Sequence, residues 1–419
     1  MGARGGPADR GVSGAASAMR RKIKQGIKTA GECAVLPLFL LLVLAVCLPW
    51  LGVRRKVAGQ PGKPKIIWGP TPIINISTNA AADRLNGYQS DTLIYRPYYV
   101  TDEFTYNLER WWRVKPLALL IPWAVFLWAV LRYDIFQLYF DGGFLNRTIG
   151  KRLEMPLLKL LGKKVIVSAY GADVRVERVT RALGTYNCCR DCTQRLVACI
   201  CDERKAARNL AHVRHYADLT LSMGDMIEYT PGSRNDVFYW AIDLKKWPFV
   251  GVSLASSPVK VVHAPNHAQF KGTRYLVECV AQLQKEGYAV ELILVQGLRN
   301  DEAMEHYKQA DIVADQFLIG WHGNFAVEAM ALGKPVIAYI RKPEDYLPKG
   351  IECPIVSANP DSLKQSLITL IENPQLRYDL GVRGRRYVEQ VFSLQHVGER
   401  MDRLYRQLQR GATVMEAAR

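Results

Sequence analysis

The stretch from Gly320 to Ile340 carries the residues with the clearest chemistry. Its sequence, GWHGNFAVEAMALGKPVIAYI, predicts a glycine-containing loop, then a helix, then an apolar strand. Gly320 and Gly323 let the backbone approach a ligand closely, and Asn324 can cap the helix. The free N–H groups at such a helix start bind phosphate, and Glu328 can then accept hydrogen bonds from sugar hydroxyls. The alternative is an ordinary loop–helix–strand unit without a ligand.

The second half of the sequence predicts strands that alternate with helices. Strands are expected at 259–263, 290–296 and 311–315, with helices at 273–285 and near 301–308. This alternation builds a parallel sheet, which binds ligands beyond the carboxyl ends of its strands. Lys271 and Gly272 follow the first strand, where a lysine can contact a phosphate. We expect Gln296 to meet a nucleotide base, and Trp321 and His322 to contact the ligand or a facing domain.

The segment 320–340 resembles the donor-site motif of GT-B glycosyltransferases, especially the retaining nucleotide-sugar enzymes of glycosyltransferase family 4. The resemblance implies that the glycine-rich loop holds the donor phosphates and that Glu328 holds the ribose. The sequence departs from the family pattern at two positions of this region. Gly320 stands where the family usually has a first glutamate. Asn266 stands where the family has the arginine of a basic pair whose lysine is Lys271.

A second match lies in the first half, where Tyr170-Gly-Ala-Asp173 follows a predicted strand at 163–169. Within the resemblance, this turn corresponds to the family's His-Gly-x-Asp turn, with Tyr170 in place of the histidine. A phenol can donate a hydrogen bond to a sugar hydroxyl but is a poor base at neutral pH. Asp173 either binds substrate or caps the next segment. The reaction centre is therefore expected to contain Lys271, Glu328, Asp173 and Tyr170, without an assigned catalytic base.

The predicted fold is α/β, with two Rossmann-like domains of the GT-B type around a central cleft. The first domain opens near Lys65 with a predicted strand–helix–strand unit that lacks G-x-G-x-x-G. We expect this domain at 64–247, a Ser- and Pro-containing linker at 248–258 and a nucleotide-sugar-binding domain at 259–395. The resemblance implies that the basic C-terminal helix at 396–419 packs back on the first domain.

The N-terminus predicts attachment to a membrane. Residues 1–33 form a basic start that we expect to be disordered, and residues 34–53 form an apolar run about long enough to span a bilayer. The run lacks a clear cleavage site, which favours an anchor over a signal peptide. Pro37 and Pro49 also allow a re-entrant hairpin. A second apolar segment, 116–131, predicts a helix with one face in lipid and its tryptophans near the interface, or a buried core helix.

Five cysteines stand close together in the first domain, between residues 188 and 201. Cys189, Cys192, Cys199 and Cys201 have a spacing that suits a structural zinc site, with Cys188 as a spare ligand. An iron–sulfur cluster, free thiols and disulfides are the alternatives. Disulfides require an oxidising compartment, and a nucleotide-sugar donor argues against that location. We expect the catalytic domains to be cytoplasmic and the metal, if bound, to be structural.

The charge of the chain favours an anionic partner. The 419 residues carry a formal net charge of +17 and are 49% apolar, so two folded domains are expected and wholesale disorder is excluded. The basic residues are scattered, without a recognition helix or an RNA-binding signature, which argues against nucleic acid. A membrane surface or a phosphorylated substrate fits better, because long apolar segments accompany the charge.

These observations predict a membrane-associated glycosyltransferase that needs no catalytic cofactor. Its donor would be a nucleotide-diphosphate sugar, and its acceptor a lipid-linked or membrane-proximal glycan. Retention of configuration is implied by the family resemblance alone. Two alternatives remain: a nucleotide-sugar epimerase of the same fold, and a non-catalytic scaffold that binds a sugar nucleotide.

Overall fold

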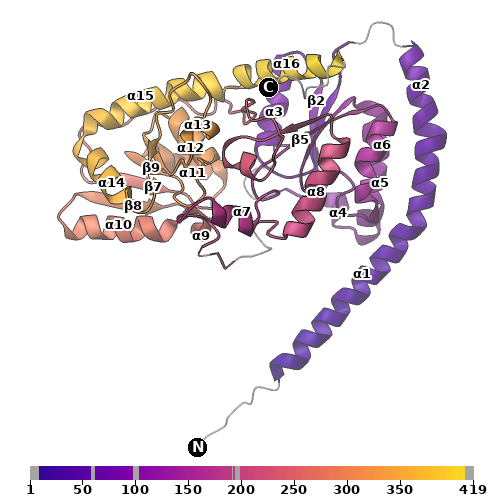
Figure 1. Cartoon of the computed structure of the whole chain (residues 1–419), viewed down its shortest axis with the longest axis horizontal. Helices are drawn as coiled ribbons and strands as arrows, with labels where there is room; N and C mark the ends of the chain where they lie inside the picture. Colours follow the sequence, from indigo (N-terminus) through magenta and orange to yellow (C-terminus); the bar gives the residue numbers. More distant parts are fainter. Residues whose placement is uncertain (1–8, 58–61, 98–102, 191, 194–198, 411–419) are drawn as a thin grey trace, which may run out of the picture.

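A computed structural model describes residues 9–57, 62–97, 103–190, 192–193 and 199–410. The described chain forms two α/β domains that lie side by side, with a long N-terminal helix along the first (Figure 1). Each domain is built on a parallel sheet. The predicted fold of two Rossmann-like domains is confirmed.

The first sheet has the strand order β3-β2-β1-β4-β5-β6. Its strands are β1 (Ile66–Trp68), β2 (Ser90–Ile94), β3 (Tyr106–Asn107), β4 (Ile135–Tyr139), β5 (Lys164–Ser168) and β6 (Leu219–Leu221). The strands β1, β4 and β5 are mostly apolar and are buried almost throughout, as expected for a parallel sheet covered on both faces. All neighbouring strands are parallel, and the order in which the chain adds them reverses between β1 and β4, so a crevice is expected there.

Helices pack on both faces of the first sheet (Figure 1). The helices of this domain are α3 (Asn75–Leu85), α4 (Glu109–Trp112), α5 (Lys115–Arg132), α6 (Glu154–Leu160), α7 (Glu177–Ala182) and α8 (Glu203–Tyr216), with the 3-10 turns η2 (Ile149–Arg152) and η3 (Gly224–Glu228). The side chain of Asp202 begins α8 by accepting a hydrogen bond from the Lys205 amide at 3.0 Å.

The second sheet has the order β11-β10-β9-β7-β8. Its strands are β7 (Val259–His263), β8 (Val290–Leu294), β9 (Ile312–Ala314), β10 (Val336–Ala338) and β11 (Val356–Ser357). Its helices are α9 (Ala268–Lys271), α10 (Thr273–Lys285), α11 (Asn300–Lys308), α12 (Asn324–Ala331), α13 (Pro343–Tyr346), α14 (Leu363–Glu372) and α15 (Pro374–Val391). The reversal of strand order lies between β7 and β9, and the loops that follow these two strands carry the predicted ligand residues.

The last helix, α16 (Leu394–Gln409), follows α15 but crosses to the first domain (Figure 1). The hydroxyl of Tyr405 on α16 donates to the buried Asp83 carboxylate of α3 at 2.9 Å and accepts from Gln137 of β4 at 2.9 Å. Gly398 lies against the Ala82 carbonyl of α3, where a Cβ atom would be 2.5 Å from that oxygen. The C-terminal helix is therefore part of the core of the first domain.

The N-terminal apolar segment is one continuous helical rod, made of α1 (Asp9–Leu42), the π-helical turn η1 (Val43–Cys47) and α2 (Leu48–Val57) (Figure 1). The prediction of disorder is wrong from Asp9 onward, because helix formation starts well before the apolar run; residues 1–8 lie outside the described chain. The re-entrant hairpin is also wrong. Pro37 lies inside α1 without reversing the chain.

The rod packs along α5 through aromatic contacts. The ring of Phe39 lies 4.7 Å from that of Trp123 and 5.6 Å from that of Phe126, measured between centroids. Trp123 is therefore in the core instead of at a membrane interface. Of the 18 residues of α5, six are buried, and Leu120 in its N-terminal half is exposed. By length and composition alone, two described helices could cross a membrane: 23–53 and 115–132.

Candidate functional site

A cleft between the two domains collects half of the predicted ligand residues. Its cavity has a volume of about 330 Å³ and lies at the carboxyl ends of β7 and β9, facing the loop after β1. Among its lining residues are six that the sequence singled out: Tyr170, Asn266, Lys271, Gly323, Asn324 and Glu328. These residues come from both domains and are brought together only by the fold.

Lys271 enters this cleft from the end of α9. The left-handed conformation of Gly272, with φ at +78°, ends α9 and leads directly into α10. The Lys271 ammonium makes an ion pair with Asp315 at 2.7 Å, and its side chain is 15% exposed. An ammonium has three N–H donors, so this ion pair leaves donors for a ligand anion. Gly272 does not line the cleft; its role is to turn the chain.

Asp315, directly after β9, is a site residue that sequence reasoning missed. Its carboxylate is fully buried, and its second oxygen accepts the Gly323 N–H at 2.6 Å. The Gly323 amide already donates to Asp315, so it is not placed to bind a phosphate as predicted. The first-turn amides of α12, which have no partner within the helix, are the remaining donors for a phosphate. The position of Asp315 at the carboxyl end of a central parallel strand was the available signal.

Glu328 lies one turn into α12 and is nearly buried. Its carboxylate accepts a hydrogen bond from the Asn300 side chain at 3.0 Å, and Asn300 also lines the cleft. Burial raises the pKa of Glu328 to about 7, against the lowering effects of Asn300 and the Lys271 ammonium. Lys271 and Glu328 therefore share one crevice, as the sequence predicted.

Asn324 has a different task from the predicted helix cap. Gly323 is the N-cap residue of α12, and no side chain caps this helix. The Asn324 side-chain amide instead exchanges two hydrogen bonds with Asn75 of α3, at 2.7 and 3.2 Å. This amide pair joins the two lips of the cleft. The contact depends on the packing of two domains, so nothing in the local sequence could reveal it.

Four other predicted contacts lie away from the cleft. Trp321 packs against Gly224 of the facing domain, where a Cβ atom would lie 2.2 Å from the indole. His322 is fully buried, and burial lowers its pKa to about 4. Gln296 is exposed beyond β8, while Leu298 and Tyr307 line the nearby wall. Trp321 therefore contacts the facing domain, which is the second of its two predicted partners, and none of these three side chains lines the cleft.

Gly320 is the fourth predicted contact that lies away from the cleft. Its backbone geometry explains why a glycine stands where the family 4 pattern usually has a glutamate. Its φ is +88°, and a Cβ atom there would lie 2.4 Å from the Arg341 guanidinium. A side chain at this position would be strained and would displace Arg341. Arg341 donates to the carbonyls of Ile319 and Tyr186, at 3.1 and 3.2 Å, and so holds the loop to the first domain.

On the first-domain side of the cleft, the predicted turn is held by its own aspartate. Asp173 accepts hydrogen bonds from the amides of Phe140, Tyr170 and Gly171 at 3.0–3.2 Å. Burial, and then the neighbouring Asp141 carboxylate, raise its pKa against these donors. Asp173 is therefore a structural residue that fixes Tyr170 at the cleft.

Asp141 is a second carboxylate that the sequence reasoning did not single out. It follows β4 and accepts hydrogen bonds from the hydroxyls of Thr71 and Tyr170, both at 3.4 Å. Burial raises the pKa of Asp141 to about 6. Burial and Asp141 also raise the pKa of Tyr170 far above its ordinary value, so Tyr170 acts as a hydrogen-bond donor and not as a base.

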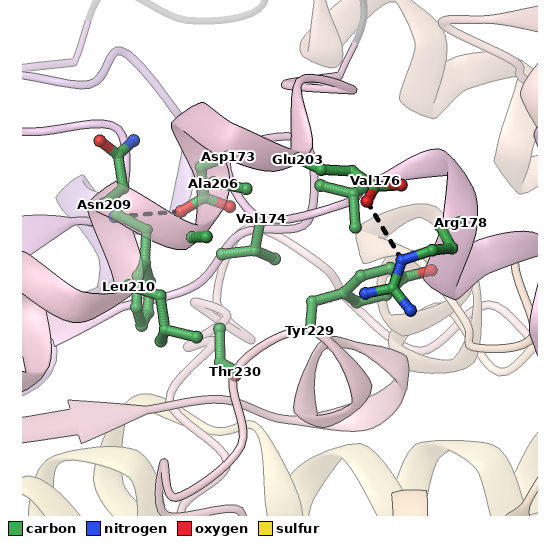
Figure 2. A pocket seen from close by; sticks show the side chains of 12 residues that line it. Asp173, Val174, Val176, Arg178, Glu203, Ala206, Asn209, Leu210, Tyr229 and Thr230 are labelled. Atoms are coloured by element: carbon green, nitrogen blue, oxygen red, sulfur yellow. Dashed lines mark hydrogen bonds and ion pairs between the residues drawn. The ribbon is translucent and has the colours of Figure 1, made fainter.

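A separate cavity of about 140 Å³ lies under α8 (Figure 2). Asp173 stands at one end, and an ion pair between Arg178 and Glu203, with N–O distance 3.1 Å, closes the other. The walls between them are mostly apolar, from residues such as Val176 and Leu210. Because its charged groups are already bonded within the protein, we assign no chemistry to this cavity.

The cysteine cluster lies at the junction of the two domains. Cys188, Cys189, Cys199 and Cys201 are buried, and they pack with Phe270 and Leu318 of the second domain. Thr193 also donates to Gln269, just before Lys271, at 2.7 Å. Among the described residues, which include all five cysteines, no group of three or more His, Cys, Asp or Glu side chains is arranged to hold a metal ion. Zinc binding stays a prediction that metal analysis would test.

No protein-family model and no curated protein sequence matches this chain. Its structure is similar to sucrose-phosphate synthase from Thermosynechococcus elongatus, with TM-score 0.55, 14% identity and coverage of 84% of this chain and 100% of that one. It is also similar to Anabaena HepE in complex with UDP-glucose, with TM-score 0.51, 12% identity and coverage of 83% and 100%. A third similar structure is an alpha-glucosyltransferase in complex with UDP and a 13-mer DNA that contains a central A:G mismatch. Its TM-score is 0.51 and its identity 10%, with coverage of 82% of this chain and 100% of that one. At these identities the likeness establishes the fold, which is GT-B.

Proposed function

We propose that this protein is a glycosyltransferase that takes a sugar from a nucleotide-diphosphate sugar bound in the interdomain cleft. The observation that carries the proposal is the convergence of Lys271, Glu328 and the start of α12 on one cavity at the β7–β9 crevice. A crevice at this point of a parallel sheet is where open α/β folds bind nucleotides. Two of the structurally similar proteins are described as complexes with UDP or UDP-glucose, which supports this ligand class.

The difficult step in this reaction is the departure of the nucleoside diphosphate. Lys271 would stabilise the negative charge that develops on the diphosphate, and the first-turn amides of α12 would add donors to its oxygens. The Asp315 carboxylate fixes the Lys271 ammonium at 2.7 Å, so the cation is oriented before substrate binds. Glu328, held by Asn300, is placed to accept hydrogen bonds from ribose hydroxyls.

The family-level features of the proposal rest on the sequence motif. The similarity of 320–340 to family 4 donor sites supports retention of configuration at the transferred sugar. A retaining reaction on the front face of the sugar needs no protein base, which agrees with the hydrogen-bonded state of Tyr170. No cofactor is required in this scheme.

The acceptor is proposed to be lipid-linked or close to a membrane. The helical rod exposes large apolar side chains along much of its length, including Leu38, Leu41, Leu44 and Trp50, each at least half exposed. The opposite side of the rod packs on α5, so these side chains point away from the domain. Such a surface suits a helix that is buried in lipid while the domain stays in the cytoplasm.

Donor binding and turnover test the proposal together. We expect the purified full-length protein to bind UDP or another nucleoside diphosphate, measured by isothermal titration calorimetry. The variant Glu328→Gln should bind it at least about tenfold more weakly, because a charged hydrogen bond to the ribose is lost. Glu278→Gln, at the same kind of residue on α10 and away from the cleft, is the matched control.

Mass spectrometry separates the three functional classes. A transferase converts the sugar nucleotide to free nucleoside diphosphate and a glycosylated acceptor, whereas an epimerase yields an isomerised sugar nucleotide without any acceptor. A scaffold binds the sugar nucleotide and leaves it unchanged across a panel of sugar nucleotides and acceptors. Absence of binding for every nucleoside diphosphate would refute the assignment of the cleft.

A further inference from the structure

A group of basic side chains lies beside the first-domain edge of the cleft. Lys151 and Arg152 come from η2, while Lys205, Arg208 and His212 recur at intervals of three and four residues along α8 and so share one face. We call these five residues the basic cluster. Lys151, Arg152 and His212 line a cavity of about 30 Å³ together with Asp141. That volume has room for about two water molecules.

The basic cluster holds more basic groups than the nearby carboxylates can balance, although Asp141 attracts both Lys151 and Lys205. Burial, and then the like charges of Arg152, Lys205 and Arg208, lower the pKa of Lys151. In the part of the chain that the structure describes, neither Lys151 nor Lys205 makes a salt bridge. Arg152 donates only to neutral oxygens of α8, at the Arg208 carbonyl and the Asn209 side chain. Basic groups that outnumber the carboxylates beside them favour an anionic ligand.

The two carboxylates that line the small cavity are engaged elsewhere. Glu154 is buried and accepts hydrogen bonds from the amides of Phe144 and Leu145, at 2.6 and 3.0 Å. Asp141 accepts from hydroxyl groups on its cleft side. In contrast, the Nε2 atom of His212 is buried without a hydrogen-bond partner in the described chain. A ligand oxygen would supply the missing partner.

The small cavity and the central cleft meet at Asp141. This residue lines the small cavity and contacts Tyr170, which lines the cleft. A molecule held by the basic cluster would therefore need to extend past a single side chain to bring a hydroxyl group to the transferred sugar. The position is that of an acceptor, since the nucleotide-binding residues lie on the opposite domain.

The basic cluster is also tied to the apolar rod. The η2 loop begins at Ile149, whose amide donates to Glu32 of α1 at 3.0 Å. Lys28, on the same helix, donates to the Arg147 carbonyl at 2.5 Å. The helix with the exposed apolar face thus holds the loop that carries Lys151. If that face lies in lipid, the loop stands at the level where lipid phosphates are found.

We propose that the basic cluster binds the phosphate or diphosphate group of the acceptor, whose reacting hydroxyl lies beside Asp141 and Tyr170. The inference deepens the proposed function and rests on it, because the ligand is an acceptor only if the protein is a transferase. The existence of the anion site does not depend on that function. The ligand chemistry is a phosphomonoester or diphosphate, carried either on an isoprenoid-like lipid or on a soluble glycan.

Binding to the full-length protein in detergent tests this site with defined probes. The probes are farnesyl diphosphate, farnesol and inorganic pyrophosphate, each titrated in the presence of excess UDP to fill the donor site. We expect farnesyl diphosphate to bind at least about tenfold more tightly than farnesol. In the double variant Lys151→Gln/Lys205→Gln, this affinity should fall at least about tenfold.

Two matched variants control for folding and for overall charge. Lys151→Arg/Lys205→Arg keeps both cations and should retain most of the affinity. Arg214→Gln/Lys285→Gln removes the same net charge at exposed positions outside the cluster, and it should change the affinity by less than about twofold. Equal binding of farnesyl diphosphate to the wild type and the glutamine variant would overturn the proposal, as would an equal loss in the control.

Further arms separate the sources of the anion. Pyrophosphate that binds as tightly as farnesyl diphosphate, and is lost in the same variant, assigns the site to a soluble phosphorylated acceptor; tighter farnesyl diphosphate assigns it to a lipid. Binding to phosphatidylglycerol vesicles is measured as well. If this binding requires Lys151 and Lys205 but farnesyl diphosphate does not compete with the vesicles, the cluster binds membranes in general and the proposal fails. UDP binding is measured on the same samples. If the wild type binds farnesyl diphosphate but not UDP, the donor site is refuted and the anion site is not.

Discussion

Two carboxylates stand behind residues of the cleft, one in each domain, and their partners differ. Asp315, after β9, contacts the Lys271 ammonium at 2.7 Å and the Gly323 amide at 2.6 Å. Asp141, after β4, accepts hydrogen bonds from two neutral hydroxyls, both at 3.4 Å. Burial raises the pKa of Asp141 to about 6. The second domain therefore presents a cation that is already oriented, whereas the first presents a weakly held carboxylate that can change partners when a substrate arrives.

The largest effect is expected from removing the cation of the second domain. Lys271→Ala leaves the buried Asp315 carboxylate without a counter-charge, which typically costs about 3–5 kcal/mol. We predict a fall of this size in the free energy of unfolding, measured by urea denaturation. The double variant Lys271→Ala/Asp315→Ala should recover much of it, and an unchanged stability of the single variant would contradict the pairing.

A smaller effect, with the opposite sign, is expected at Glu328. Its pKa is raised to about 7 from 4.5, so between these pH values the folded state binds more protons than the unfolded state and stability falls as pH rises. Glu328→Gln removes this loss and should stabilise the protein by up to about 3 kcal/mol at pH 8, with little change at pH 4. Unfolding curves at both pH values measure it.

The same substitution should weaken nucleotide binding, so Glu328 would sacrifice stability for function. A variant that is more stable at pH 8 and still binds nucleotide normally would separate the two roles and remove Glu328 from the donor site. Equal stabilisation at both pH values would show that its carboxylate titrates normally.

The first-domain carboxylate is expected to act on the acceptor alone. Asp141→Asn keeps a side chain that can bond Thr71 and Tyr170 but removes the charge beside the cleft. We predict UDP affinity within about twofold of the wild type and transfer to an acceptor lowered about tenfold, which corresponds to one charged hydrogen bond. A parallel loss of UDP affinity would show that the two cleft edges do not act separately.

The smallest effect concerns the contact that joins the two edges. A double-mutant cycle with Asn75→Ala and Asn324→Ala should give a coupling of about 1 kcal/mol in the free energy of unfolding, the value of an ordinary neutral hydrogen bond. The coupling should be absent between Asn75→Ala and Asn300→Ala, because Asn300 bonds to Glu328 instead. Additive effects of Asn75→Ala and Asn324→Ala would mean that the domains are not held together at this point.

The elements whose positions follow from strand ends were predictable. Lys271 and Glu328 share a cleft because both follow central strands of a parallel sheet, and the sequence pattern of apolar strands and helices indicated that sheet. Asp315 satisfied the same rule, but its role became visible only through its contacts with Lys271 and Gly323. Residue types and spacing therefore located the crevice without showing which polar groups in it pair with each other.

Contacts between distant segments could not be predicted from spacing. Asn324 bonds to Asn75, which is 249 positions away, and not to its own helix. Trp321 and His322 have polar atoms that suit a ligand, but their large rings fill the space against Gly224 and Phe392. The apolar run at 116–131 gave no sign of which face would be covered, because its partner is another apolar helix.

The placement of α16 affects when the first domain can finish folding. Asp83 is buried inside that domain, and one of its carboxylate oxygens is satisfied by Tyr405, 322 positions later. During synthesis, residues 394–409 leave the ribosome only after the whole second domain has emerged. The first domain therefore cannot complete its core before α16 is made, and a fragment that stops at the interdomain linker would leave the Asp83 carboxylate and the surface of α3 uncovered.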